Sequence, residues 1–140
     1  LSCADSRVSP EWVFDAAPSD LFVVRSAGNT AFDNAIASME FTVSALNTPL
    51  IMVMGHSACG AVKAARDGAP LTPLLEQLVS PIRSSLTPGD DLEAAVKGNA
   101  RHTAQQLTQR SSVLADAVNK RQLKIVASYF DIHSGTVTLL

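Results

Sequence analysis

LIMVMGHSAC, residues 50–59, joins a short apolar run to a histidine and a cysteine. Residues 50–54 contain no polar side chain, and near-continuous apolar runs are typical of strands in a parallel sheet that is covered on both faces. The Ala-rich stretch 59–66 follows and ends near Gly68, which predicts a helix. A strand followed at once by a helix is the building unit of α/β folds.

Other apolar runs extend this pattern. Residues 1–3 are interpreted as the end of a first strand, and residues 21–24 and 123–130 as further buried strands. A turn ending at Gly135 folds the chain back into a last strand at residues 136–139. We therefore predict an α/β fold with a mostly parallel central sheet, flanking helices and a final antiparallel strand.

Helical stretches lie between these runs. They are predicted at four places besides 59–66, namely after Ser9 and over residues 33–46, 90–109 and 111–120. The segment 70–88 carries four prolines and predicts a short helix that Pro81 breaks. We expect Trp12 to pack under the first helix, and Asn99 to lie on a polar helix face, in solvent or at a subunit contact.

The composition indicates a single domain over residues 1–140. Hydrophobic residues make up 46%, but no apolar stretch approaches the ~20 residues that cross a bilayer, so no membrane association is expected. The net charge of −2, without a basic stripe, gives no support to nucleic-acid binding. No targeting segment is visible, so we expect a cytoplasmic location, or an organelle or other compartment if such a segment was removed.

His56 and Cys59 lie three residues apart at the turn between the predicted strand and helix. Cys3 follows the presumed first strand, and ligands gather at the carboxyl ends of strands in parallel sheets, so we expect all three side chains at one edge. Two thiolates and an imidazole favour zinc, and three ligands leave the fourth tetrahedral position open, as in catalytic sites. The alternatives are a capping histidine beside a buried cysteine, and a Cys3–Cys59 disulfide.

Asp5 and Arg7 alternate with Cys3 along the same segment. A carboxylate held bidentately by a guanidinium has a fixed orientation and stays ionised. Beside a metal-bound water, it would accept a hydrogen bond and orient the hydroxide. The alternative interpretation is a structural ion pair at the end of a strand.

The motifs Cys-x-Asp-x-Arg at residues 3–7 and His-x-x-Cys-Gly at residues 56–60 resemble those of the β-class carbonic anhydrases. The resemblance extends to residues 21–29, to residues 36–41 and to the last hairpin. It implies the fold of that family and covers nearly the whole chain.

The resemblance also implies specific roles. One zinc ion per chain is bound by Cys3, His56 and Cys59, and Asp5 and Arg7 form the catalytic dyad. The backbone amide of Gly60 helps to hold bicarbonate, which suits a glycine at a helix N-terminus. Phe22 and Phe41 form an aromatic pocket wall; without the resemblance, both would be interpreted as core residues. Members of the family are dimers or multiples of dimers with an N-terminal helical arm. We expect this arm to be missing from the chain, either because the sequence is cut or because the protein has none.

The function implied is the reversible hydration of carbon dioxide to bicarbonate and a proton by zinc-bound hydroxide, since zinc lowers the pKa of its water to about 7. A proton shuttle is required, and His102 and His133 are candidates by residue type only. A first alternative keeps the site and hydrolyses carbonyl sulfide or carbon disulfide. A second is a non-catalytic, zinc-binding regulatory domain.

Overall fold

The computed structural model describes residues 1–68 and 70–140, and these residues contain a three-stranded sheet in the order β1–β2–β3. Strands β1 (Leu50–His56) and β2 (Lys124–Asp131) pair in parallel, with Leu50 opposite Lys124 and His56 opposite Phe130. Strand β3 (Thr136–Leu139) pairs antiparallel with β2. The predicted α/β fold, with a parallel pair and a final antiparallel strand, is confirmed.

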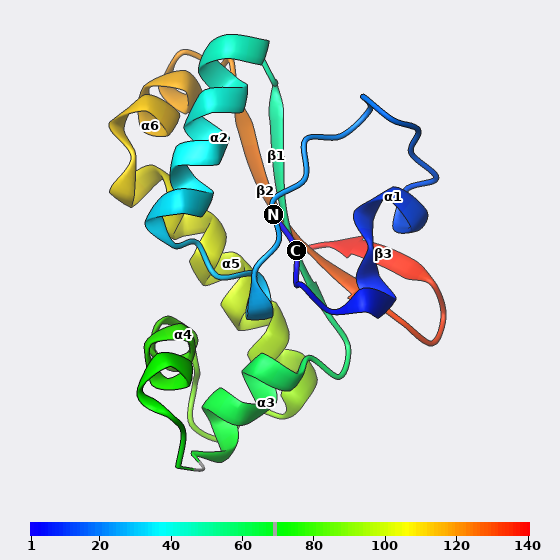
Figure 1. Cartoon of the computed structure of the whole chain (residues 1–140), viewed down its shortest axis with the longest axis vertical. Helices are drawn as coiled ribbons and strands as arrows, with labels where there is room; N and C mark the ends of the chain where they lie inside the picture. The colour runs from blue at the N-terminus through cyan, green and yellow to red at the C-terminus, as the bar shows by residue number, and fades with distance from the viewer. Residues whose placement is uncertain (69) are drawn as a thin grey trace.

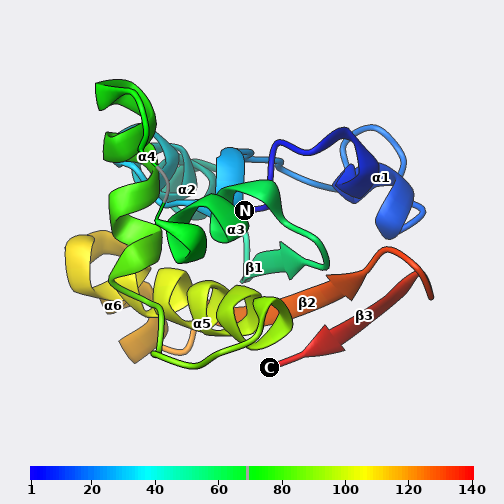
Figure 2. The same ribbon diagram turned by 90° about the horizontal axis from the view of Figure 1, so that it is seen from below.

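Helices gather on one side of the strands in Figures 1 and 2, where α2, α4, α5 and α6 lie to the left and α1 lies to the right with β3. The helical elements are η1 (Ser6–Val8), α1 (Pro10–Val13), η2 (Ala27–Asn29), α2 (Asp33–Leu46), α3 (Gly60–Asp67), α4 (Pro73–Arg83), α5 (Leu92–Arg110) and α6 (Ser112–Asn119). The predicted helices at 33–46, 59–66, 90–109 and 111–120 agree with these bounds to within two residues. None of the helices in the described ranges is long and apolar enough to cross a membrane.

Residue Ser2 lies between two neighbouring segments. It forms parallel bridges to Met54 of β1 and to Arg25. Its amide donates to the carbonyl of Val24 at 3.0 Å, and its carbonyl accepts from the amide of Ser26 at 3.1 Å. Residues 1–3 therefore lie directly beside β1 as expected, but isolated bridges alone join them to it, so they do not form the predicted strand.

The prediction of a buried strand at residues 21–24 is wrong. These residues are extended but pair with the chain only where Ser2 reaches them, so the ladder is too short for a strand. Leu21 and Phe22 are more than two-fifths exposed. Their hydrophobic side chains lie at the surface, and a run of apolar residues does not distinguish this case from a buried strand.

Two local predictions also need correction. Pro81 does not break α4, which ends at Arg83: a proline removes only one backbone hydrogen bond, and buried Val79 and Ile82 hold this last turn in place. Trp12 is 86% exposed, because α1 is a single turn that turns Pro10 and Val13 inward and Trp12 away.

Two hydrophobic clusters fill the interior, one at each end of β1. The cluster at its carboxyl end is built on α3, α4 and the first half of α5, and includes Cys3 and Cys59. The other packs α2 and α6 against the first half of β1. Gly55 lets α5 approach the sheet, because a Cβ there would lie 2.8 Å from Cγ1 of Val96. The carboxyl end of β1 is therefore enclosed by close packing.

Candidate metal centre

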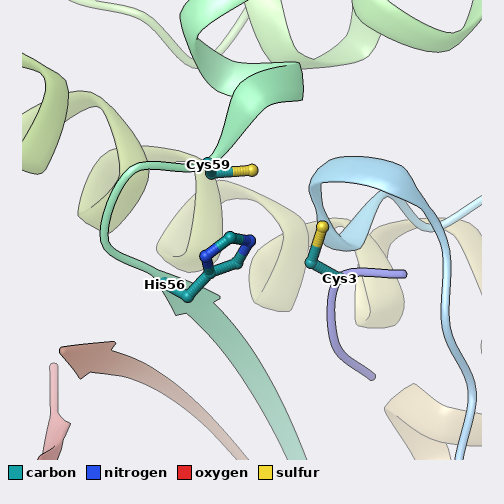
Figure 3. Close-up of side chains that lie close together, drawn as sticks. All are labelled: Cys3, His56 and Cys59. Carbon is teal, nitrogen blue, oxygen red and sulfur yellow. The ribbon is translucent and has the colours of Figure 1, made fainter. Parts of the chain in front are cut away.

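Cys3, His56 and Cys59 converge at the carboxyl end of β1. All three are buried, and one ligand atom of each lies within 4.8 Å of the other two. Figure 3 shows the two sulfur atoms and the imidazole ring facing a common point, from the N-terminal segment, the end of β1 and the turn before α3. A tetrahedral zinc ion places such ligand atoms about 3.5–3.8 Å apart, so the group needs to contract by only about 1 Å.

The His56 ring is oriented for coordination. Its Nδ1 lies 2.9 Å from the carbonyl oxygen of Ser57. A carbonyl can only accept, so Nδ1 carries the proton and Nε2 has a free lone pair. Nε2 is buried and has no hydrogen-bond partner within the protein. A buried acceptor without a partner is costly, and a metal ion satisfies it.

The turn that carries His56 and Cys59 is tied to β2. The amide of Ser57 donates to the carbonyl of Phe130 at 2.9 Å, and the amide of Ile132 donates to the Ser57 hydroxyl at 2.9 Å. Ala58 adopts a left-handed backbone conformation with φ of 55°, which is unfavourable for a residue with a Cβ. The strained turn brings Cys59 back toward His56 at the start of α3.

Cys3 is held from two directions. The amide of Gly28 donates to its sulfur at 3.3 Å. Arg25 donates from Nε to the Cys3 carbonyl at 2.9 Å and from a terminal nitrogen to the Asp5 carbonyl at 2.5 Å. Neither Arg25 nor Gly28 was predicted to support the site, because backbone contacts leave no spacing signal in the sequence.

The two thiols lie close together, and their pKa values are shifted in opposite directions. A hydrogen bond from Cys59 lowers the pKa of Cys3 to about 4 against the opposing effect of burial, and His56 and the amides of Asp5 and Gly28 lower it further. The same hydrogen bond, together with burial, raises the pKa of Cys59. A divalent cation takes the place of the Cys59 proton and favours both thiolates. Both cysteines are free, so the disulfide alternative is not what the structure shows.

The three residues thus fit a zinc ion. They provide two soft thiolate ligands and one imidazole with a free lone pair, and this set leaves a fourth position for a small molecule. Among the residues that the structure describes, this is the one group of three such side chains that can hold a metal.

Asp5 and Arg7 form a bidentate ion pair beside Cys3. Arg7 donates from Nε to one carboxylate oxygen at 2.9 Å and from a terminal nitrogen to the other at 2.6 Å. The Arg7 amide also donates to Asp5 at 3.0 Å. These hydrogen bonds hold the pKa of Asp5 well below its usual range. The carboxylate is therefore fixed in orientation and ionised.

Comparison with known proteins agrees with this arrangement. The sequence profile of the carbonic anhydrase family matches residues 1–137. The chain belongs to the β-class carbonic anhydrases. It is 36% identical to carbonic anhydrase 2 of Mycobacterium tuberculosis, over 99% of this chain and 72% of that protein.

Solved β-carbonic anhydrases share the fold. The enzyme of Aspergillus fumigatus superimposes with a TM-score of 0.89 at 27% identity, covering 100% of this chain and 73% of that one. A tetrameric enzyme of Sordaria macrospora superimposes with a TM-score of 0.86 at 23% identity, covering 100% and 78%, and supports the fold alone. The Cys-His-Cys group is accordingly the zinc site of a carbonic anhydrase, with one zinc per chain.

Other residues predicted from the carbonic anhydrase resemblance lie around the centre in different ways. Gly60 is the first residue of α3, is exposed, and has no atom within 4 Å of where a Cβ would stand. Phe22 and Phe41 are 46% and 58% exposed, so they are not core residues, and their ring centroids are 6.5 Å apart. Their roles toward substrate remain predictions.

Neither histidine that was considered as a shuttle belongs to the zinc group. His102 lines a polar cavity of about 220 Å³ with Thr30 and Arg110, and the three zinc ligands are absent from its lining. His133 is exposed in the β2–β3 turn.

We predict that His56→Ala abolishes zinc retention, because it removes the one ligand whose free lone pair has no partner within the protein. His133→Ala is the matched control, since that ring is exposed and outside the group. Zinc per chain, measured by elemental analysis after gel filtration, should be about one for the wild type and the control and close to zero for His56→Ala. Retention of zinc by His56→Ala would contradict the ligand assignment.

Proposed function

We propose that this chain catalyses the reversible hydration of carbon dioxide through the roles set out below for its own residues. The observation that carries the proposal is the buried Cys3–His56–Cys59 group with the carboxylate of Asp5 fixed next to it in sequence and space. A purely structural zinc site needs neither an open ligand position nor an oriented carboxylate.

A bound zinc ion would act as a Lewis acid and would lower the pKa of a water molecule to about 7. Asp5 accepts a hydrogen bond from the attacking water through the lone pairs that Arg7 leaves free, and this directs the oxygen toward the carbon of carbon dioxide. Because Arg7 keeps the pKa of Asp5 low, the carboxylate orients the water rather than storing its proton. The amide of Gly60, at the start of α3, faces the developing negative charge of bicarbonate.

We expect Asp5→Asn to lower kcat for hydration by about 10²-fold, since removing one hydrogen-bond partner that is oriented toward the reacting group typically costs about 10²–10³-fold in kcat. Asp33→Asn is the control. Asp33 lies on α2 and also forms an ion pair with an arginine, Arg110 of α5. Hydration is measured by stopped flow with a pH indicator, on protein whose zinc content is determined in the same preparation.

The result separates the alternatives. If the zinc-loaded wild type hydrates carbon dioxide slowly but hydrolyses carbonyl sulfide or carbon disulfide, one of these sulfur compounds would be the substrate in place of carbon dioxide. Zinc without either activity would indicate a regulatory domain. An unchanged hydration rate in Asp5→Asn would show that the Asp5–Arg7 dyad is not part of the mechanism, although the protein would still be a carbonic anhydrase.

Gly60→Ala tests the substrate contact without disturbing the fold. The added Cβ meets no protein atom, and alanine is favoured in helices over glycine by up to ~1 kcal/mol, so Tm should stay unchanged or rise. We expect kcat/KM to fall about 10-fold because the methyl group occupies the space of the anion. Gly98→Ala on α5 is the control, where the nearest atom, the Ser85 carbonyl oxygen, is 3.5 Å away. Equal activity in both variants would exclude the Gly60 contact.

We further propose a homodimer, or a multiple of dimers. A groove of about 400 Å³ runs between the N-terminal segment, residues 20–24 and β1, and four large hydrophobic side chains of its lining are more than a third exposed: Phe14, Leu21, Phe22 and Leu50. Phe41 lies against Phe22 at its margin. Contiguous exposed apolar surface of this kind is typical of protein–protein contacts. In the dimer, Phe22 and Phe41 would be covered and would form the apolar wall of the substrate pocket.

Leu50→Lys should shift the protein toward the monomer, because it places a charge in the groove that the second copy covers. Leu74→Lys on α4 is matched in chemistry, is 77% exposed, and lies outside the groove lining. Sedimentation velocity should give at least twice the chain mass of 14.8 kDa for wild type and Leu74→Lys, and a smaller mass for Leu50→Lys. A monomeric wild type at micromolar concentration would contradict the proposal. The cytoplasmic location and the single domain over residues 1–140 stay predictions.

A further inference from the structure

Asn99 is a polar residue of α5 that the proposed chemistry does not use. It was expected on a solvated face, or at a subunit contact, but it is 1% exposed. Its Nδ2 donates to the carbonyl oxygen of Gly28 at 2.8 Å, and this hydrogen bond is buried. Burying an amide is costly unless its hydrogen bonds are satisfied, so this side chain needs a structural or functional reason.

Gly28 connects Asn99 to the metal centre. Its own amide donates to the sulfur of Cys3 at 3.3 Å, in a buried contact. Asn99 therefore binds the carbonyl of Gly28, and the amide of the same residue donates to a zinc ligand. The path from α5 to the sulfur contains two hydrogen bonds and one residue.

The position of Gly28 is closely confined. Its φ is +67°, and a Cβ on it would lie 2.6 Å from Cδ1 of Ile82 and 3.1 Å from the Cβ of Ala61. Residues of α3 and α4 thus pack closely against the Cα of Gly28, which takes no part in the two hydrogen bonds. Packing limits translation of the residue, but it does not set the direction of the N–H, which depends on the rotation of the backbone.

The Asn99 amide is itself oriented. The Ser85 hydroxyl, which donates to the carbonyl of Ile82 at 2.6 Å, also lies 3.4 Å from Oδ1 of Asn99. The carbonyl oxygen of Gly28 can only accept a hydrogen bond, so Nδ2 is the atom of the Asn99 amide that faces it. The amide group consequently acts as a fixed donor toward the Gly28 carbonyl.

We propose that Asn99 is a positioning residue for the zinc centre: by holding the Gly28 carbonyl, it aims the Gly28 N–H at the Cys3 sulfur and fixes the direction of that ligand. The inference rests on the proposed function, because it requires Cys3 to bind the metal. Partners that orient metal ligands through hydrogen bonds typically change metal affinity or activity by 10–100-fold when they are removed.

Asn99→Leu is the informative variant. Leucine has the same branched skeleton of four side-chain heavy atoms, although its methyl groups are bulkier, and it cannot donate, so the Gly28 carbonyl loses its partner. Alanine is less suitable, because Asn99 also lines the polar cavity of about 220 Å³, and a truncated side chain would let water replace the amide there.

Two controls share the same helix. Leu107→Val loosens the core elsewhere, since Leu107 is fully buried in the second hydrophobic cluster and not beside Gly28. Gln105→Ala removes an exposed polar side chain from α5. Together they separate loss of the Gly28 contact from general destabilisation, which is followed by Tm.

The measurements are zinc release from the holoprotein to an excess of chromogenic chelator, and the thiolate-to-cobalt charge-transfer spectrum of cobalt-substituted protein. Asn99→Leu should release zinc 10–100 times faster than wild type and shift the cobalt band, while both controls match wild type. A release rate and spectrum of Asn99→Leu equal to wild type would overturn the inference and leave the enzyme intact. The same changes in Leu107→Val would also overturn it. Wild type that takes up neither metal would overturn the metal centre as well.

Discussion

The double pairing of Ser2 is the constraint on which the metal centre depends. His56 and Cys59 are three residues apart in sequence, and the turn after β1, which is hydrogen-bonded to β2, brings them together. Cys3 reaches them only because the chain around Ser2 bridges Met54 on one side and Arg25 on the other. The amide of Met54 donates to the carbonyl of Leu1 at 2.9 Å, which sets the register. A slip of one residue would turn Cys3 to the other face and separate the ligands.

Negative charge gathers at this end of the sheet, and the surroundings are arranged to tolerate it. Two thiolates and the Asp5 carboxylate face the guanidinium of Arg7 and several backbone amides. The amides of Ala61 and Val62, at the start of α3, lower the pKa of Cys59 against its burial and its contact with Cys3. Arg7 is half-exposed, so its charge is partly screened, and its value lies more in the direction that it gives to the carboxylate than in net stabilisation. Arg25 is bonded instead to carbonyls, which makes it a clamp on the backbone between Cys3 and Asp5.

Much of this could be predicted from the sequence, and the failures have physical causes. The strand at Leu50, the helix after Cys59 and the final hairpin carry strong local signals, and so does the spacing of His56 and Cys59. The apolar run around Phe22 predicts a buried strand, but hydrophobicity alone does not show whether other residues cover the run. The sequence predicts Asn99 in solvent or at a subunit contact because polar residues usually lie at the surface, and no pattern in α5 distinguishes the one amide that turns inward. Contacts made by backbone atoms, such as the Gly28 amide on Cys3, leave no trace in residue types.

The distance along the chain between the ligands also matters for folding. Coordination by Cys3 and His56 joins the N-terminal segment to the end of β1 and closes a loop from residue 3 to residue 56. A cross-link of that span removes entropy from the unfolded chain worth about 4 kcal/mol on the loop-closure model used for disulfides. His56 and Cys59 are close in sequence, whereas Cys3 is brought to them by the pairing of Ser2 with Met54 and Arg25. Zinc therefore acts as a cross-link between the N-terminal segment and the end of β1, and its loss would release residues 1–8 from that cross-link.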